Sequence, residues 1–185
     1  MNAPARFLSH VEIIHRPGER VLAARFLDLM GVELEDAMGG SYMLAVIDRP
    51  TYRPAEFTNF MAGCEVHPEQ WAFESELISA MADGPLGETF AAYQRKLDEH
   101  PTSGMHVGIH YATVADWEAV VERFQRIDQD CPELAGRARL ASVTRPGDPN
   151  SPAPLYQAFI WTDIVSSGSL AIGQRFELSA LPSQA

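Results

Sequence analysis

Apolar and polar residues alternate in two short segments of the chain that resemble each other. Residues 9–13 read Ser-His-Val-Glu-Ile, and residues 105–109 read Met-His-Val-Gly-Ile. Alternation of this kind is typical of a β-strand that buries one face. Because a similar segment returns in the second half, we interpret the chain as an internal repeat.

Each of these segments is followed by an apolar pattern with helical spacing. After the first, Pro17-Gly18 interrupts the chain, and Gly31 ends the pattern. After the second, Thr113 precedes Asp116 by three positions, which is typical of a helix N-terminus. The apolar residues of the two predicted helices are Leu22, Phe26, Leu29 and Met30, and Trp117, Val120, Val121 and Phe124.

Three further strand-like segments follow each predicted helix. They comprise residues 31–36, 42–48 and 57–66 in the first half, and 137–144, 156–165 and 170–181 in the second. Each half therefore reads β-α-β-β-β, which predicts an α+β fold. We expect one domain over residues 1–185, with a first βαβββ module at residues 6–67 and a second at residues 104–181.

Residues 68–103, between the modules, carry two helical patterns. Pro68 is suited to a first helical turn, Asp83-Gly84-Pro85 interrupts the pattern, and a second helix is expected before His100-Pro101. We interpret this segment as a helical insertion that packs against the modules. The alternative is a lid over a site or a contact in a homodimer.

Strand side chains point alternately to the two faces of a sheet, which separates core residues from candidate ligands. His10 shares a face with Glu12 in the first strand, and His106 shares a face with His110 in its repeat. If the helices cover the valine–isoleucine face, both leading histidines point to the open side.

The closing strand of each module carries a glutamate. In the last strand, Phe176 and Leu178 are expected in the core, which leaves Glu177 on the open face. In residues 59–67, Glu65 and His67 are expected on the open face. The core side chains of that strand would then be Phe60, Ala62, Cys64 and Val66.

Four of these polar side chains form a candidate metal site. Two imidazoles with one or two carboxylates are a ligand set for Fe(II), Ni(II), Zn(II), Mn(II) or Co(II). The four occupy the first and last strands of two equivalent modules, so we predict that they hold one divalent metal ion. They are His10, Glu65, His106 and Glu177.

Composition narrows the class of partner. The 185-residue chain has a formal net charge of −11. Because phosphate binding depends on Lys and Arg, neither nucleic acid nor an anionic membrane is expected. Cys64 and Cys131 match no disulfide framework or metal-ligand spacing, and no apolar run approaches the ~18 residues of a membrane span. We expect a cytoplasmic protein that acts on a small molecule.

The order of these segments resembles that of the vicinal oxygen chelate superfamily. This superfamily includes glyoxalase I, type I extradiol dioxygenases, methylmalonyl-CoA epimerase and bleomycin-resistance proteins. The resemblance rests on residues 9–13, 24–33, 105–109 and 176–178. It implies two βαβββ modules that form an open, cup-shaped mixed sheet around a divalent metal, to which two neighbouring substrate oxygens bind.

A glyoxalase-like lyase or isomerase is the first function that the resemblance implies. Its His/Glu/His/Glu ligand set is similar to the four candidate ligands of this chain. Glu65 would leave the metal and remove a proton beside a carbonyl, while the metal charge stabilises the developing enediolate.

An extradiol-type ring-cleaving dioxygenase is the second. Its Fe(II) would be held by a facial triad of His10, His106 and Glu177, with open positions for a catecholic substrate and O₂. His67 or His110 would act as the acid–base residue.

The third function is metal-free ligand binding, as in the bleomycin-resistance proteins. The presence of four ligand-type residues argues against this third function. Because a fold does not fix a function, all three remain open, with the lyase or isomerase slightly ahead.

Overall fold

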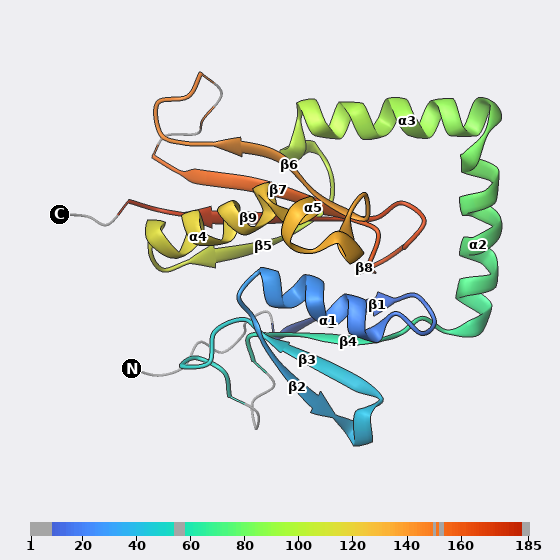
Figure 1. The fold of residues 1–185 in the computed structure, drawn as a ribbon, viewed down its shortest axis with the longest axis horizontal. Helices are drawn as coiled ribbons and strands as arrows, with labels where there is room; N and C mark the ends of the chain where they lie inside the picture. The colour runs from blue at the N-terminus through green and yellow to red at the C-terminus, as the bar shows by residue number, and fades with distance from the viewer. Residues whose placement is uncertain (1–8, 54–57, 150, 152–153, 183–185) are drawn as a thin grey trace.

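The first half of the chain folds in the predicted order of elements, and the second half does so with α5 and β8 in addition. A computed structural model describes residues 9–53, 58–149, 151 and 154–182. The first half contains β1 (His10–His15), α1 (Arg20–Leu29), β2 (Glu33–Ala37), β3 (Tyr42–Val46) and β4 (Phe60–Glu65). The second contains β5 (His106–Tyr111), α4 (Val114–Gln125), α5 (Ile127–Asp130), β6 (Ala138–Thr144), β7 (Tyr156–Thr162), β8 (Val165–Ser166) and β9 (Gln174–Ala180). The predicted α+β class is confirmed (Figure 1).

The described strands form two open sheets rather than one. The first sheet has the order β2-β3-β4-β1-β8 and the second the order β5-β9-β7-β6. In each module the first strand runs parallel to the last, so β1 pairs with β4 and β5 pairs with β9. The leading histidine of each module therefore lies beside its closing strand.

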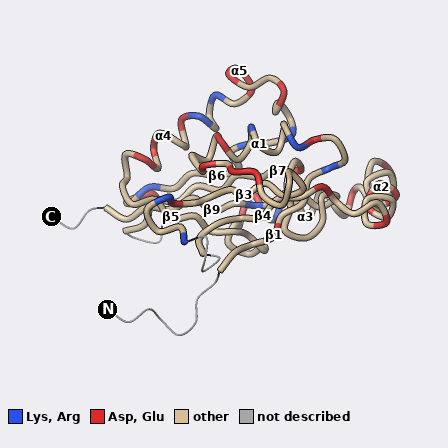
Figure 2. Tube along the Cα trace, turned by 90° about the horizontal axis from the view of Figure 1, so that it is seen from below, with Lys and Arg blue, Asp and Glu red and all other residues tan. Residues whose placement is uncertain are grey.

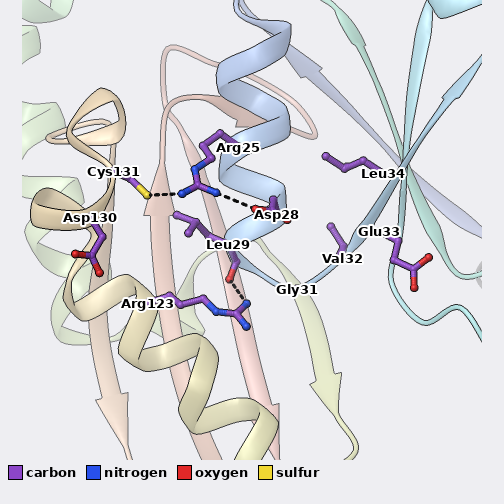
Figure 3. Close-up of a pocket in the computed structure, with 10 residues that line it drawn as sticks. All are labelled: Arg25, Asp28, Leu29, Gly31, Val32, Glu33, Leu34, Arg123, Asp130 and Cys131. Atoms are coloured by element: carbon purple, nitrogen blue, oxygen red, sulfur yellow. Dashed lines mark hydrogen bonds and ion pairs between the residues drawn. The ribbon is translucent and has the colours of Figure 1, made fainter.

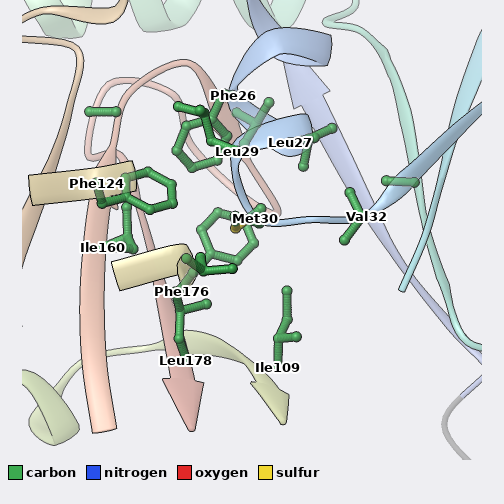
Figure 4. Packing of buried hydrophobic residues seen from close by; sticks show 14 of the residues in the cluster. Phe26, Leu27, Leu29, Met30, Val32, Ile109, Phe124, Ile160, Phe176 and Leu178 are labelled. Carbon is green, nitrogen blue, oxygen red and sulfur yellow. The ribbon is translucent and has the colours of Figure 1, made fainter. Parts of the chain in front are cut away.

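The two modules share one apolar core. Phe26 of α1 lies with its ring centroid 5.9 Å from that of Phe124 in α4 and 5.7 Å from that of Phe176 in β9. Figure 4 shows these side chains packed together between the helices and the strands. Each large side chain buried in this way contributes about 1.5–3 kcal/mol to folding. Figure 2 shows α1, α4 and α5 on one side of the sheets.

Helix N-termini follow from local sequence. The Thr113 hydroxyl accepts a hydrogen bond from the backbone N–H of Asp116 at 3.1 Å, which caps α4 as predicted. The apolar stripe of α4 is buried, and so are most of the apolar residues of α1. Because these stripes pack against one face of the sheets, the side chains on the other face do not contact α1 or α4.

The insertion forms the two predicted helices. They are α2 (Pro68–Ala82) and α3 (Gly84–Glu99), followed by a short 3-10 turn at Pro101–Ser103. Figure 1 shows the pair as an angled arm beside the two modules. Among the described helices, none combines the length and apolarity that crossing a bilayer requires.

Two further contacts join the modules. β8, from the second half, pairs antiparallel with β1, so that Ile14 faces Ser166 and His15 faces Val165. Beside this pairing, the Asp163 carboxylate accepts hydrogen bonds from Arg16 at 2.6 Å and from Arg137 at 2.5 Å. The two modules are thus tied by both backbone and charge.

The side-chain orientation expected for β4 is wrong. Met61 belongs to the core beneath α1, whereas Phe60 and Ala62 pack in a separate cluster on the other face. His10 lies opposite Phe60 in register, and their rings stack with centroids 5.2 Å apart. Both faces of β4 are apolar at these positions, so hydrophobicity alone could not assign them.

Candidate functional site

His106 and Glu177 form the centre of the candidate site. In the β5–β9 register, His106 lies beside Arg175 and Gly108 beside Glu177, all on the face opposite α1 and α4. His106 Nε2 lies 2.9 Å from Glu177 Oε2, and the two side chains are partly buried, with exposed fractions of 26% and 18%. The parallel pairing of two strands therefore brings together two of the four predicted ligands.

Neighbouring groups orient both side chains. His106 Nδ1 lies 2.9 Å from the Gly104 carbonyl oxygen, and Gln157 Nε2 donates to Glu177 Oε1 at 2.7 Å. The His106 ring also meets Phe159 edge-on, with centroids 5.6 Å apart. Such outer contacts fix the tautomer and direction of a metal-binding histidine.

The contact to Gly104 restricts what lies between His106 and Glu177. A carbonyl oxygen only accepts, so Nδ1 must carry its proton. Nε2 then either carries a second proton or presents a lone pair toward the carboxylate oxygen. Two facing lone pairs 2.9 Å apart require a cation between them. The geometry therefore suits a proton or a metal ion.

The spacing of this pair also agrees with metal coordination. Ligand atoms about 2.1 Å from one ion and at right angles to each other lie about 3.0 Å apart. The Nε2–Oε2 distance of 2.9 Å is close to that value. His106 and Glu177 therefore fit two neighbouring positions on a divalent cation.

His10, from the first module, lines a cavity together with His106. This cavity measures about 310 Å³, and its other walls include Phe60 and Gly108. His10 Nδ1 lies 2.9 Å from the Ser9 hydroxyl oxygen, and Nε2 lies 4.0 Å from Glu12 Oε1. The cavity lies where β1 and β5 approach each other, so a ligand there would contact both modules.

Glu65 does not share this site. It ends β4 on the face that carries Met61 and Gly63, where it pairs in register with His15. Its carboxylate accepts a hydrogen bond from the Gly18 backbone N–H at 2.8 Å. The first-module position equivalent to Glu177 is Ala62, which lies beside Glu12 as Glu177 lies beside Gly108. Contrary to the prediction from the sequence, Glu65 is therefore not the first-module equivalent of Glu177, and it lies on the opposite face of its strand.

The two candidate acid–base histidines lie in different places. His67 follows β4 at the start of α2, is 76% exposed, and contacts Glu69 at 2.5 Å, so it points away from the cavity. His110 lies on the same face of β5 as His106, and its Nδ1 is 3.1 Å from the Ser179 hydroxyl. Of the two, only His110 shares the face of the candidate ligands.

Three ligating side chains are not gathered at one point. Across the part of the chain that the structure describes, no three His, Cys, Asp or Glu side chains are grouped closely enough to hold an ion. The His106–Glu177 pair fits a metal by chemistry and spacing, and His10 lines a cavity with His106 whose walls do not include Glu177.

A larger cavity lies on the helix side of the molecule. It measures about 770 Å³ and lies between α1 and α4–α5, as Figure 3 shows. Arg25 donates to Asp28 at 3.0 Å and to Cys131 Sγ at 3.2 Å, while Arg123 donates to the Leu29 carbonyl. These polar groups satisfy one another, and none of the predicted ligands lines this cavity.

Sequence reasoning missed a cluster next to the His106–Glu177 pair. Arg175 is only 4% exposed and is bound by Gln94 and Asp98 of α3. Asp98 also binds Arg139 of β6. The available signal was Arg175, an arginine in a strand of mostly apolar residues. A buried guanidinium needs an acidic partner, so its position could have indicated this cluster.

Comparison with known proteins adds no assignment. No protein-family model matches the chain, and no curated protein matches it significantly.

Proposed function

We propose that this chain is a divalent-metal-dependent enzyme of the two-histidine, one-carboxylate kind. His10, His106 and Glu177 would hold the metal, and the substrate would be a small molecule with neighbouring oxygens. When bound, such a metal supplies Lewis-acid and oxygen chemistry at positions that the protein leaves open. Ring cleavage of a catechol is the reaction that we favour.

The observation that carries this proposal is the contact between His106 Nε2 and Glu177 Oε2 at 2.9 Å, made while Nδ1 is committed to a carbonyl. It supports a cation between the two groups. Ala62 at the fourth ligand position favours three protein ligands over four. The position of Glu65 weakens the lyase hypothesis, because Glu65 was the proposed base of that reaction and lies on the opposite face of β4.

The remaining residues would bind and orient the substrate. Phe60 places aromatic surface beside His10 in the cavity wall, which suits a flat ring. His110 lies four residues beyond His106 on the same face, about 13 Å along the strand. This separation leaves His110, with Nδ1 against Ser179, too far away to exchange a proton directly with a small substrate bound at His106.

Metal analysis and oxygen uptake test the proposal. Purified protein loaded with Fe(II) under anaerobic conditions is expected to retain about one ion per chain. It should then consume O₂ and form a yellow product with catechol. His106→Ala and Glu177→Ala should each lower metal affinity by at least about tenfold, as expected when a ligand is lost.

Glu65→Ala provides the matched control, because it removes a carboxylate from the closing strand of the other module. It should retain wild-type metal content. If Glu65→Ala loses the metal while Glu177→Ala keeps it, the ligand assignment is wrong. If the wild-type protein takes up no metal but binds catechol tightly, the chain is instead a metal-free binding protein.

A further inference from the structure

We propose that Arg139 and Arg175 form a carboxylate-binding subsite that Asp98 of α3 closes. Arg175 donates to Asp98 Oδ1 at 2.8 Å, and Arg139 donates to Asp98 Oδ2 at 2.7 Å. Each oxygen of one carboxylate is thus bound by a different arginine. This arrangement, which we call the arginine clamp, is suited to a free carboxylate as well as to Asp98.

The arginine clamp lies beside the His106–Glu177 pair. One row of residues crosses the second sheet on the face opposite α1 and α4, with His106 next to Arg175, Arg175 next to Trp161, and Trp161 next to Arg139. Adjacent strands are about 4.8 Å apart, so a small molecule could reach both places. That the carboxylate belongs to the substrate rests on the proposed function, whereas carboxylate binding by the clamp does not.

The clamp has more donors than Asp98 satisfies. Arg175 is 4% exposed, yet its Nε–H has no acceptor among the described residues, and the same holds for the shielded Nε1–H of Trp161. The guanidinium of Arg139 lies over the Trp161 ring, 5.6 Å from its centroid. A buried N–H without an acceptor costs free energy, so a ligand that brought further oxygens would be favoured.

A ligand carboxylate could replace Asp98 only if α3, the helix that carries Asp98, moved away from the sheet. It belongs to α3, which begins at Gly84 with a φ of +73°, and most side chains of α3 are exposed. Apart from Leu97, which is buried, α3 contacts the sheet through Asp98 and Gln94. Displacement of Asp98 by a ligand carboxylate would exchange one set of charged hydrogen bonds for an equivalent set.

Benzoate binding in the presence of EDTA tests the clamp without metal. Wild type must release Asp98 before benzoate enters, which weakens its apparent affinity by the fraction of open molecules. Asp98→Asn removes the competing charge and is expected to bind benzoate at least about tenfold more tightly than wild type by calorimetry. Benzamide should bind neither protein.

Two further variants complete the design. Glu99→Gln removes the same charge from the neighbouring exposed position of α3 and should behave as wild type. Arg139→Met in the Asp98→Asn background should abolish the gain. The proposal is overturned if Asp98→Asn binds no more tightly than Glu99→Gln, or if the gain survives Arg139→Met.

If Asp98→Asn does not fold, hydrogen exchange on the wild-type protein tests the proposal instead. High benzoate should speed amide exchange over residues 94–99 of α3, with no increase in β9, while benzamide should not. Unchanged exchange in α3 would overturn the proposal. Metal content measured on the same variants is expected to be normal, so failure of the clamp and failure of the metal site are separable.

Discussion

The pKa of the Cys64 thiol, on the open face of the first sheet, depends on its neighbours on that face. Partial burial raises the pKa of the Cys64 thiol, the charge of Glu12 raises it further, and a hydrogen bond with Tyr42 opposes both effects. The thiolate is the reactive form, so a raised pKa slows alkylation at mild pH. Cys64 should therefore be less reactive than an ordinary exposed cysteine.

Glu12→Gln should speed this reaction. Without the negative charge the pKa of Cys64 falls, and the thiolate fraction at pH 8 rises. We expect the rate of iodoacetamide labelling to increase severalfold, below the factor of about ten that a full pKa unit gives. Glu65→Gln is the control, because Glu65 lies on the other face of the same strand. Equal acceleration by both changes would contradict the assigned faces.

At this scale the sequence predicted the second module better than the first. In β5 and β9, polar residues alternate with buried Ile109, Phe176 and Leu178, so the faces of His106 and Glu177 follow directly. In β4, apolar residues occupy both faces, and Glu65 ends the strand where a loop amide binds it. Alternation carries no information when both faces are buried.

At the scale of elements, α2 is held mainly by one buried carboxylate. Glu74 is 2% exposed and accepts hydrogen bonds from Gln70 Nε2 at 2.7 Å, Ser169 Oγ at 3.1 Å and the Ala171 backbone N–H at 2.8 Å. Most other side chains of α2, including Phe73, remain at least partly exposed. The link to the loop before β9 therefore consists of the Glu74 carboxylate together with Gln70 Nε2, which donates to the Gly168 carbonyl at 3.1 Å.

Glu74→Gln should loosen this attachment. The amide would point a donor at groups that are themselves donors, and a lost charged hydrogen bond costs about 1.5–3 kcal/mol. We expect a lower free energy of unfolding in urea and faster exchange of the Ala171 amide. Glu76→Gln, on the exposed side of the same helix, should change neither measurement. Normal protection of Ala171 in Glu74→Gln would refute this account.

Helix positions were predictable because periodicity is local. The stripes of α1 and α4, the Thr113 cap and the break before Gly84 all followed from residues close in sequence. β8 was not predicted as a separate strand, since it has two residues and exists only through its pairing with β1. The docking of α3 by Asp98 also depends on partners far along the chain.

At the scale of the whole molecule, Asp163 connects the two modules. It binds Arg16 from the first half and Arg137 from the second, and Arg137 also binds Glu19 beside α1. These side chains are between about one-fifth and one-quarter exposed, so solvent screens them only in part. The group therefore holds the modules in their relative orientation.

Asp163→Asn should weaken this connection. It leaves two arginines without their shared carboxylate, and we expect a loss of about 2 kcal/mol in the free energy of unfolding. Metal affinity should also fall, because His10 and His106 come from different modules. Asp130→Asn breaks an exposed pair with Arg126 confined to one end of α5, and should cost less than about 0.5 kcal/mol. Similar losses in both variants would contradict the connecting role.

The pairing of β1 with β8 also has a consequence for biosynthesis. His15 is translated about 150 residues before its partner Val165. Until then, the edge of β1 that awaits β8 has no strand to pair with in the emerging chain, and such edges invite association with other chains. Native pairing of β1 must therefore wait until β8 has been synthesised, and a product truncated before β8 would be prone to aggregate.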